Sequence, residues 1–131
     1  LALHRGFLKH ATDAVAVAIL RHMVEDKERH VAFGWRYLAE RAVRWSDQIR
    51  EEIERETEQV LEGLVYAGYI CPWLAPQPLG LSVTEADIVT RRAGLGAMLP
   101  AEEKRIVDEY LSEARDQLLQ LNVQLRGVID A

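Results

Sequence analysis

The stretch that decides the fold runs from Asp13 to Trp45 and reads DAVAVAILRHMVEDKERHVAFGWRYLAERAVRW. Apolar residues recur along it at the spacing of an amphipathic helix. Thr12 and Asp13 are good N-cap residues for the start of that helix. At about 1.5 Å per residue the helix is about 50 Å long, a length that suits a bundle better than a compact globular α fold.

Two further long segments predict helices. Ser46 supplies an N-cap for a second helix that runs towards Tyr69, with an outer face dense in charge that we interpret as solvated. Pro100 and the acids that follow it start a last helix, whose apolar residues form an a/d seam from Val107 to Val128. Such a seam is typical of packing inside a bundle or of a subunit contact.

The remaining segments are shorter. The first eight residues predict the end of one element and a turn into the next. The segment Cys71 to Gly80 contains three prolines and predicts an irregular connector, followed by a short helix from Thr84 to near Gly94 or Gly96. No segment shows the alternation of β-branched residues that a sheet requires. We therefore expect an all-α fold and a single helical domain over residues 1–131.

Composition and charge exclude several classes of protein. The chain has 131 residues, 49% of them hydrophobic and 28% charged, which excludes disorder and a disulfide scaffold. Sixteen Lys and Arg against twenty-one Asp and Glu give a net negative charge, which argues against binding of nucleic acid. The longest apolar run, Ala14 to Leu20, is too short to span a membrane. With the lone Cys71 in addition, we expect a protein of a reducing, cytoplasmic compartment.

Three polar residues interrupt the apolar arc of the long helix when it is projected at about 100° per residue. These are Asp26, Lys27 and His30. Buried charges must neutralise one another, meet partners on another helix or bind something, so the cluster is either a satisfied core group or a functional site. Gly34, one turn further on, costs helix stability and predicts close approach by another helix or a ligand.

The run Glu25-Asp26-Lys27-Glu28-Arg29-His30-Val31-Ala32-Phe33-Gly34, followed by Tyr37 and Leu38, resembles the last metal-ligand helix of ferritin-like carboxylate proteins. It is most similar to the branch of ribonucleotide reductase radical subunits and R2-like ligand-binding oxidases. In that branch the helix carries a pattern of the form D-E-x-R-H-V-x-F-G. Its Glu and His ligate one metal of a two-metal centre. The resemblance implies a four-helix bundle whose other helices supply the remaining carboxylates and a second His.

Carried over residue by residue, the resemblance makes His30 a metal ligand and Asp26 the acid that supports it. Lys27 stands where the family has its ligand Glu, and Glu28 is one residue too late to ligate on a regular helix. The implied cofactor is iron or manganese, or none, because the Lys27 ammonium replaces that carboxylate. Lys27 and Tyr37 are the candidate catalytic residues, although a core aromatic with a satisfied hydroxyl also explains Tyr37.

Two functions follow from the resemblance. The first is membership, whole or as a fragment, of the R2-like oxidoreductases, in which a two-metal site activates oxygen. The alternative is a metal-free, degenerate ferritin-like subunit that acts in assembly or protein interaction. Because the other ligand helices of the family precede this one, we expect the chain to be the C-terminal half of a longer ferritin-like domain. Its expected partners are the missing N-terminal helices, another subunit or a second copy in a homodimer.

Overall fold

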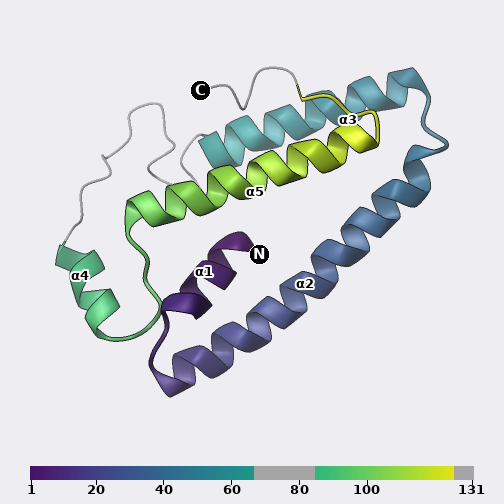
Figure 1. Cartoon of the computed structure of the whole chain (residues 1–131). Coiled ribbons are helices and arrows are strands. Elements are labelled where there is room, and N and C mark those ends of the chain that lie inside the picture. The colour runs from purple at the N-terminus through teal and green to yellow at the C-terminus, as the bar shows by residue number, and fades with distance from the viewer. Residues whose placement is uncertain (67–84, 126–131) are drawn as a thin grey trace. The chain divides into compact units, whose positions relative to one another are not determined.

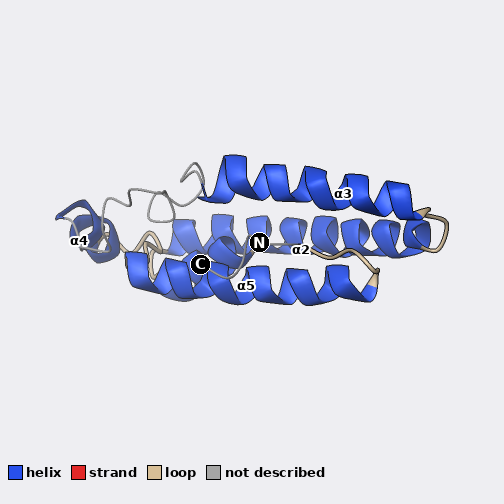
Figure 2. Cartoon of the chain, turned by 90° about the horizontal axis from the view of Figure 1, so that it is seen from above, coloured by secondary structure: helices blue, strands red, loops and turns tan. Residues whose placement is uncertain are grey.

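The computed structural model describes residues 1–66 and 85–125, and the expected proline-rich connector with Cys71 lies outside them. The described elements are α1 (Ala2–His10), α2 (Ala14–Ala42), α3 (Asp47–Val60), the π-helix η1 (Leu61–Tyr66), α4 (Glu85–Arg92) and α5 (Pro100–Gln120) (Figure 1). Figure 2 shows helices and loops throughout this part of the chain. The β pairing found in it is an isolated bridge between Ala11 and Leu95. The predicted all-α fold is confirmed.

The predicted helix starts are confirmed by their capping hydrogen bonds. The Asp13 carboxylate accepts the backbone N–H groups of Val15 at 3.0 Å and Ala16 at 2.9 Å. The Ser46 hydroxyl accepts the N–H of Ile49 at 3.4 Å. Both caps satisfy donors that the first turn of a helix leaves without intrahelical partners.

The helix ends differ from those predicted. The first residues form α1, which continues to His10, where a turn was expected. Helix α2 ends at Ala42 rather than near Trp45, because the chain tightens there into a turn in which Trp45 N–H donates to the Ala42 carbonyl oxygen.

The last helix stops short of the predicted seam. Asn122 has a φ of 58° and ends α5 at Gln120. The N–H of Val123 donates to the Leu118 carbonyl and that of Asn122 to the Leu119 carbonyl, which is the Schellman arrangement. The fully buried Val123 follows. The end of the predicted seam, Val128, lies outside the described residues.

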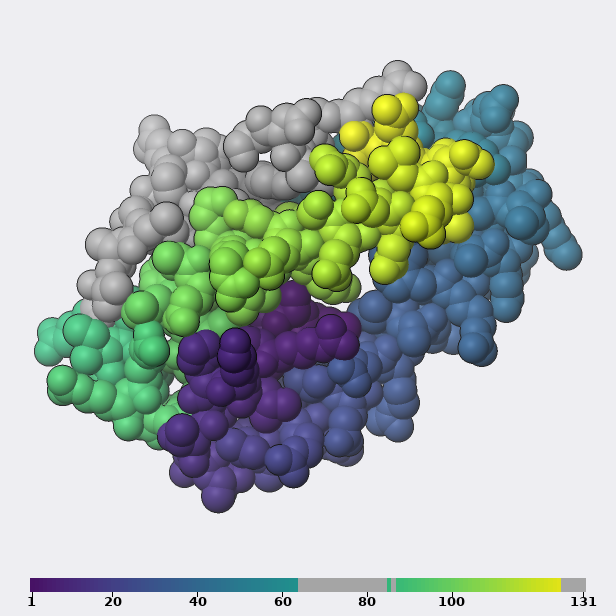
Figure 3. Space-filling view, viewed as in Figure 1, coloured from purple at the N-terminus to yellow at the C-terminus, as the bar shows by residue number. Residues whose placement is uncertain are grey.

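Contacts divide the chain into two compact units, of which the first takes in residues 1–36 and 81–107. Its core includes Val24, Met98 and Val107. Gly6 of α1 is buried against Met98 and Ile106, and Figure 3 shows α1 against the start of α5. The missing side chain at Gly6 therefore lets α1 approach this segment closely.

The second unit takes in residues 37–80 and 108–131. Its buried residues include Ala42 and Val123. The Arg50 guanidinium donates to the carbonyl oxygens of Ala42, at 2.9 Å, and of Leu121, and lies 5.9 Å from the centre of the Trp45 ring. One side chain of α3 thus joins residues at the ends of two other helices in this unit.

Candidate functional site

Helix α2 buries one of its faces within the first unit. Val24 is buried, and Leu20 and Val31 are half-buried on the same side of the helix. On the neighbouring turn, Glu28 accepts a hydrogen bond from Arg5 of α1 at 2.8 Å. The inner face of α2 is therefore centred on Val24 and borders α1.

A second series of residues on α2 faces outward, and we call it the outer stripe. Its members are Ile19, Met23, Asp26, His30 and Phe33. They alternate spacings of four and three, which confines them to an arc of about 80° at about 100° per residue. Three of them are large apolar residues with exposed fractions of 56%, 39% and 70%, for Ile19, Met23 and Phe33 in turn.

The orientation expected for the polar cluster is wrong. Lys27 and His30 are exposed and Asp26 is half-buried, so they do not interrupt a buried surface. The apolar arc expected on α2 consists of two stripes whose centres lie about 120° apart, and the cluster belongs to the exposed one. In the described part of the chain no other segment lies within 4 Å of a Cβ placed at Gly34, so no described helix approaches it closely, and approach by a ligand stays a prediction.

The polar members of the outer stripe form a small network along one helix. His30 Nδ1 lies 3.5 Å from one carboxylate oxygen of Asp26, and the Arg29 guanidinium lies 3.6 Å from the other. The His30 side chain is 68% exposed. The structure therefore brings together His30 and Asp26, as predicted, but in solvent and with Asp26 shared between two basic groups.

These residues do not make a metal site by themselves. One imidazole and one carboxylate are fewer donors than a stable iron or manganese site needs. Within residues 1–66 and 85–125, no three His, Cys, Asp or Glu side chains are grouped so that they could hold an ion. Glu28, the other acid near His30, is engaged by Arg5 instead. That His30 ligates a metal stays a prediction.

Lys27 lies at one edge of the outer stripe, on the side nearer α1. The pKa of His4 in α1 is lowered, first by burial, then by the positive charges of the chain's amino terminus and of Lys27. The ammonium of Lys27 is thus close enough to α1 to act on His4 through its charge. The nearby Asp26 carboxylate faces His30 and Arg29 instead of Lys27, and the role of Lys27 as an ion substitute stays a prediction.

Tyr37 lies further along α2, in the second unit. Its side chain is 48% exposed, and the Arg41 guanidinium lies 5.3 Å from the centre of its ring. The interpretation of Tyr37 as a core aromatic is therefore wrong. A redox role for Tyr37 stays a prediction.

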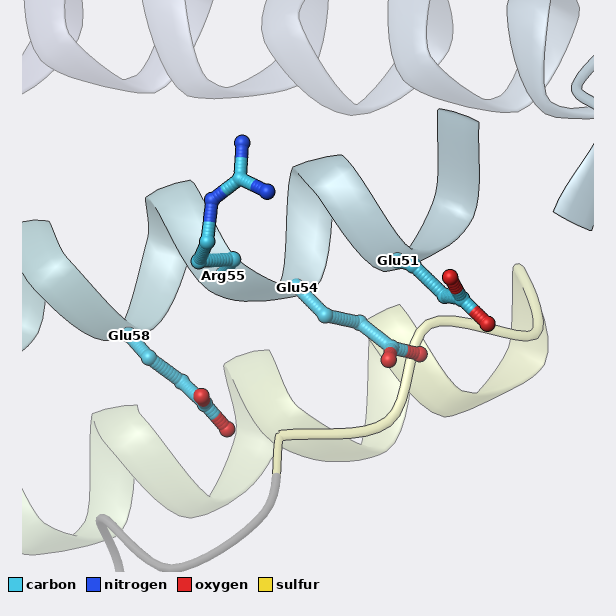
Figure 4. Close-up of a pocket in the computed structure, with 4 residues that line it drawn as sticks. All are labelled: Glu51, Glu54, Arg55 and Glu58. Atoms are coloured by element: carbon cyan, nitrogen blue, oxygen red, sulfur yellow. The ribbon is translucent and has the colours of Figure 1, made fainter. Parts of the chain in front are cut away.

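Four charged side chains of α3 line a pocket on its surface. Figure 4 shows the carboxylates of Glu51, Glu54 and Glu58 on one side of α3 and the Arg55 guanidinium pointing away from them. Glu54 accepts the backbone N–H of Gln124 at 2.6 Å. Glu51 is exposed, but Glu54 and Glu58 are half-buried, so the expected solvated face of α3 is confirmed only in part.

Sequence reasoning missed the role of Arg50. Arg50 is one of the charged residues on the face of α3 that was expected to be solvated, yet its side chain is half-buried and donates to two backbone carbonyls. The sequence around Arg50 does not predict these hydrogen bonds, because both acceptors are main-chain carbonyls at the ends of other helices.

Comparisons with known proteins give no family for the chain: no family model, no curated protein and no solved structure matches it significantly. Among the described helices, none combines the length and the apolar character needed to cross a membrane.

Proposed function

We propose that this chain is a helical subunit that functions by assembly, and that the outer stripe of α2 receives an amphipathic helix. The observation that carries the proposal is the alignment of three exposed apolar side chains, Ile19, Met23 and Phe33, on one face of α2, with Ile19 and Phe33 more than half exposed. Asp26 and His30 occupy the two positions between Met23 and Phe33, and the alternating spacings of four and three match the seam of a partner helix. The docked helix would extend the described helices towards the ferritin-like bundle that the resemblance implies.

The exposed apolar area of the stripe sets the apolar contribution to binding. Fully burying one large apolar side chain contributes about 1.5–3 kcal/mol, and these side chains are already partly covered. Covering Ile19, Met23 and Phe33 should thus contribute about 2–4 kcal/mol in all. Removing one of them should cost about 1 kcal/mol, or about a fivefold loss of affinity.

A synthetic helical peptide tests the proposal. The peptide carries leucine at its a and d positions and neutral glutamine at the flanking positions, and its matched control has the same composition with the seam scrambled. We expect the seam peptide to bind the chain, and Ile19→Ser to weaken that binding about fivefold while far-UV circular dichroism stays unchanged. Equal binding of both peptides, or of both proteins, contradicts assembly through the stripe.

A second candidate function is the R2-like oxidoreductase. It is favoured by one observation: His30 and Asp26 lie on the outer stripe itself, so a helix that docks there would cover both. The described residues do not fit a two-metal centre alone, so this function requires carboxylates from the docked helix. We expect the purified chain to bind no iron or manganese stoichiometrically, and Lys27→Glu to raise metal affinity only if the expected ligand position is the right one.

Metal analysis of wild type, Lys27→Glu and Lys27→Glu/His30→Ala separates these cases. Affinity that rises in Lys27→Glu and is lost again with His30→Ala supports the carried-over ligand pair. Affinity that is the same in all three proteins contradicts a ligand pair that holds metal without carboxylates from another helix.

A further inference from the structure

The two edges of the outer stripe carry the same sign of charge. Lys27 flanks it on the side towards α1, and Arg29 and Arg36 flank it on the other side. All three side chains are exposed, that of Arg29 to 72%. In heptad terms, with Met23 and His30 at a positions, Lys27 is an e residue while Arg29 and Arg36 are g residues.

The acids near the stripe offset these cations only in part. Asp26 lies within the seam and is shared by His30, at 3.5 Å, and Arg29, at 3.6 Å. Glu25 lies about 120° from the centre of the seam at about 100° per residue, beyond the reach of a helix packed on the stripe. The surface that meets the edges of a docked helix is therefore basic.

We propose that the helix which docks on the outer stripe is acidic along both of its edges, with Asp or Glu at the positions that face Lys27, Arg29 and Arg36. The proposal rests on the proposed function and specifies its partner. In paired helices the e and g residues select the partner through their charges, and complementary charges also speed its association. A net charge of -5 for the whole chain makes this basic band a local feature rather than a general property of the surface.

The same charges disfavour a second copy of the chain as the partner. In an antiparallel pair, e residues face e residues and g residues face g residues, so Lys27 would approach Lys27 and Arg29 would approach Arg29. In a parallel pair, e residues face g residues, which here again sets cation near cation. Like charges at such positions are destabilising, so self-association through the stripe is opposed in either direction.

Two peptides that differ only in edge charge test the proposal on the full chain. Both carry the leucine seam of the neutral peptide, with glutamate at all e and g positions in one and lysine in the other. We expect the glutamate peptide to bind about tenfold more tightly than the lysine peptide at low salt. The difference should shrink at about 1 M salt, where the Debye length is about 3 Å.

Variants of the chain localise the effect. Lys27→Glu/Arg29→Glu should reverse the preference, so that the lysine peptide binds more tightly. Arg21→Glu is the matched control, because Arg21 is exposed on α2 about 160° away from the stripe and its reversal should leave the preference unchanged.

Three results overturn the proposal: equal affinity for both charged peptides, an Arg21→Glu effect as large as that of the double reversal, or a dimer of the free chain that Ile19→Ser dissociates. Binding of the neutral peptide distinguishes failure of the acidic-partner proposal from failure of the proposed function. If the neutral peptide binds through the seam and the two charged peptides bind equally, the result supports assembly through the stripe and contradicts an acidic partner. If no peptide binds through the seam, both proposals are contradicted.

Discussion

Replacing Gly96 with alanine should loosen the first unit where the loop before α5 crosses α1. Gly96 is buried and has a φ of 95°, a conformation that L side chains rarely adopt. A Cβ there would overlap the carbonyl oxygen of Phe7 and lie 3.0 Å from its carbon. It would also lie 3.3 Å from Leu20 on the inner face of α2. The substitution therefore strains the loop and pushes the α1 backbone away from it.

The expected loss follows from two costs. A non-glycine residue in such a conformation costs about 1–3 kcal/mol, and overpacking a tight contact costs a further amount of about 1–3 kcal/mol. The alanine also restricts the unfolded chain, which offsets about 0.4–1 kcal/mol. We expect Gly96→Ala to lower the free energy of unfolding by about 2–4 kcal/mol and the Tm by about 10 °C.

Gly34→Ala in the same unit is the matched control. Gly34 lies within α2, and no other segment among the described residues comes within 4 Å of a Cβ placed there. Alanine in a helix interior is more favourable than glycine, so this variant should gain about 0.5–1 kcal/mol. The two glycine replacements are thus expected to act with opposite sign.

Urea unfolding followed by circular dichroism at 222 nm measures both variants, and amide hydrogen exchange locates the change. Gly96→Ala should exchange faster in α1, where the Phe7 backbone lies. The reasoning is refuted if Gly96→Ala unfolds at the same urea concentration as wild type, or if Gly34→Ala is destabilised as much as Gly96→Ala.

Two further predictions concern polar contacts, one in each unit. Arg50→Met should lower the free energy of unfolding by about 2 kcal/mol in urea titrations, because it leaves the Ala42 and Leu121 carbonyls without their charged donor. Its control, Arg55→Met at an exposed ion pair, should cost less than about 0.5 kcal/mol, and equal losses would contradict the bridging role of Arg50. The pKa of the Glu102 carboxyl is lowered, chiefly by the hydrogen bond that its carboxylate accepts from the Leu99 N–H at 2.9 Å. The ionised Glu102 therefore stabilises the fold above its ordinary pKa of 4.5, and this contribution is lost as the pH falls through the lower pKa of the folded state. Glu102→Gln should therefore reduce the acid-induced loss of stability over that range in thermal unfolding measured at a series of pH values, and an unchanged acid profile would contradict the assignment.

The helix starts could be predicted from the sequence because capping is local. Asp13 and Ser46 bond backbone N–H groups within three residues, so the residue types nearly suffice to place the caps. The end of α5 was less visible. An apolar seam continues past Gln120, and only the left-handed backbone at Asn122 shows that Val123 is buried outside the helix.

Whether the candidate site is buried or exposed could not be predicted from the sequence. Helix α2 carries two apolar series, one through Leu20 and Val24 and one through Ile19 and Phe33, and a helical projection merges them into one arc. The sequence alone determined that both exist and that Asp26 and His30 lie together. Only the tertiary structure decided which series is buried, because that depends on where α1 packs, and α1 can pack closely where Gly6 and Gly96 leave room for it. Burial is a property of contacts between distant segments, so the same pattern that predicts a helix leaves open which of its faces is covered.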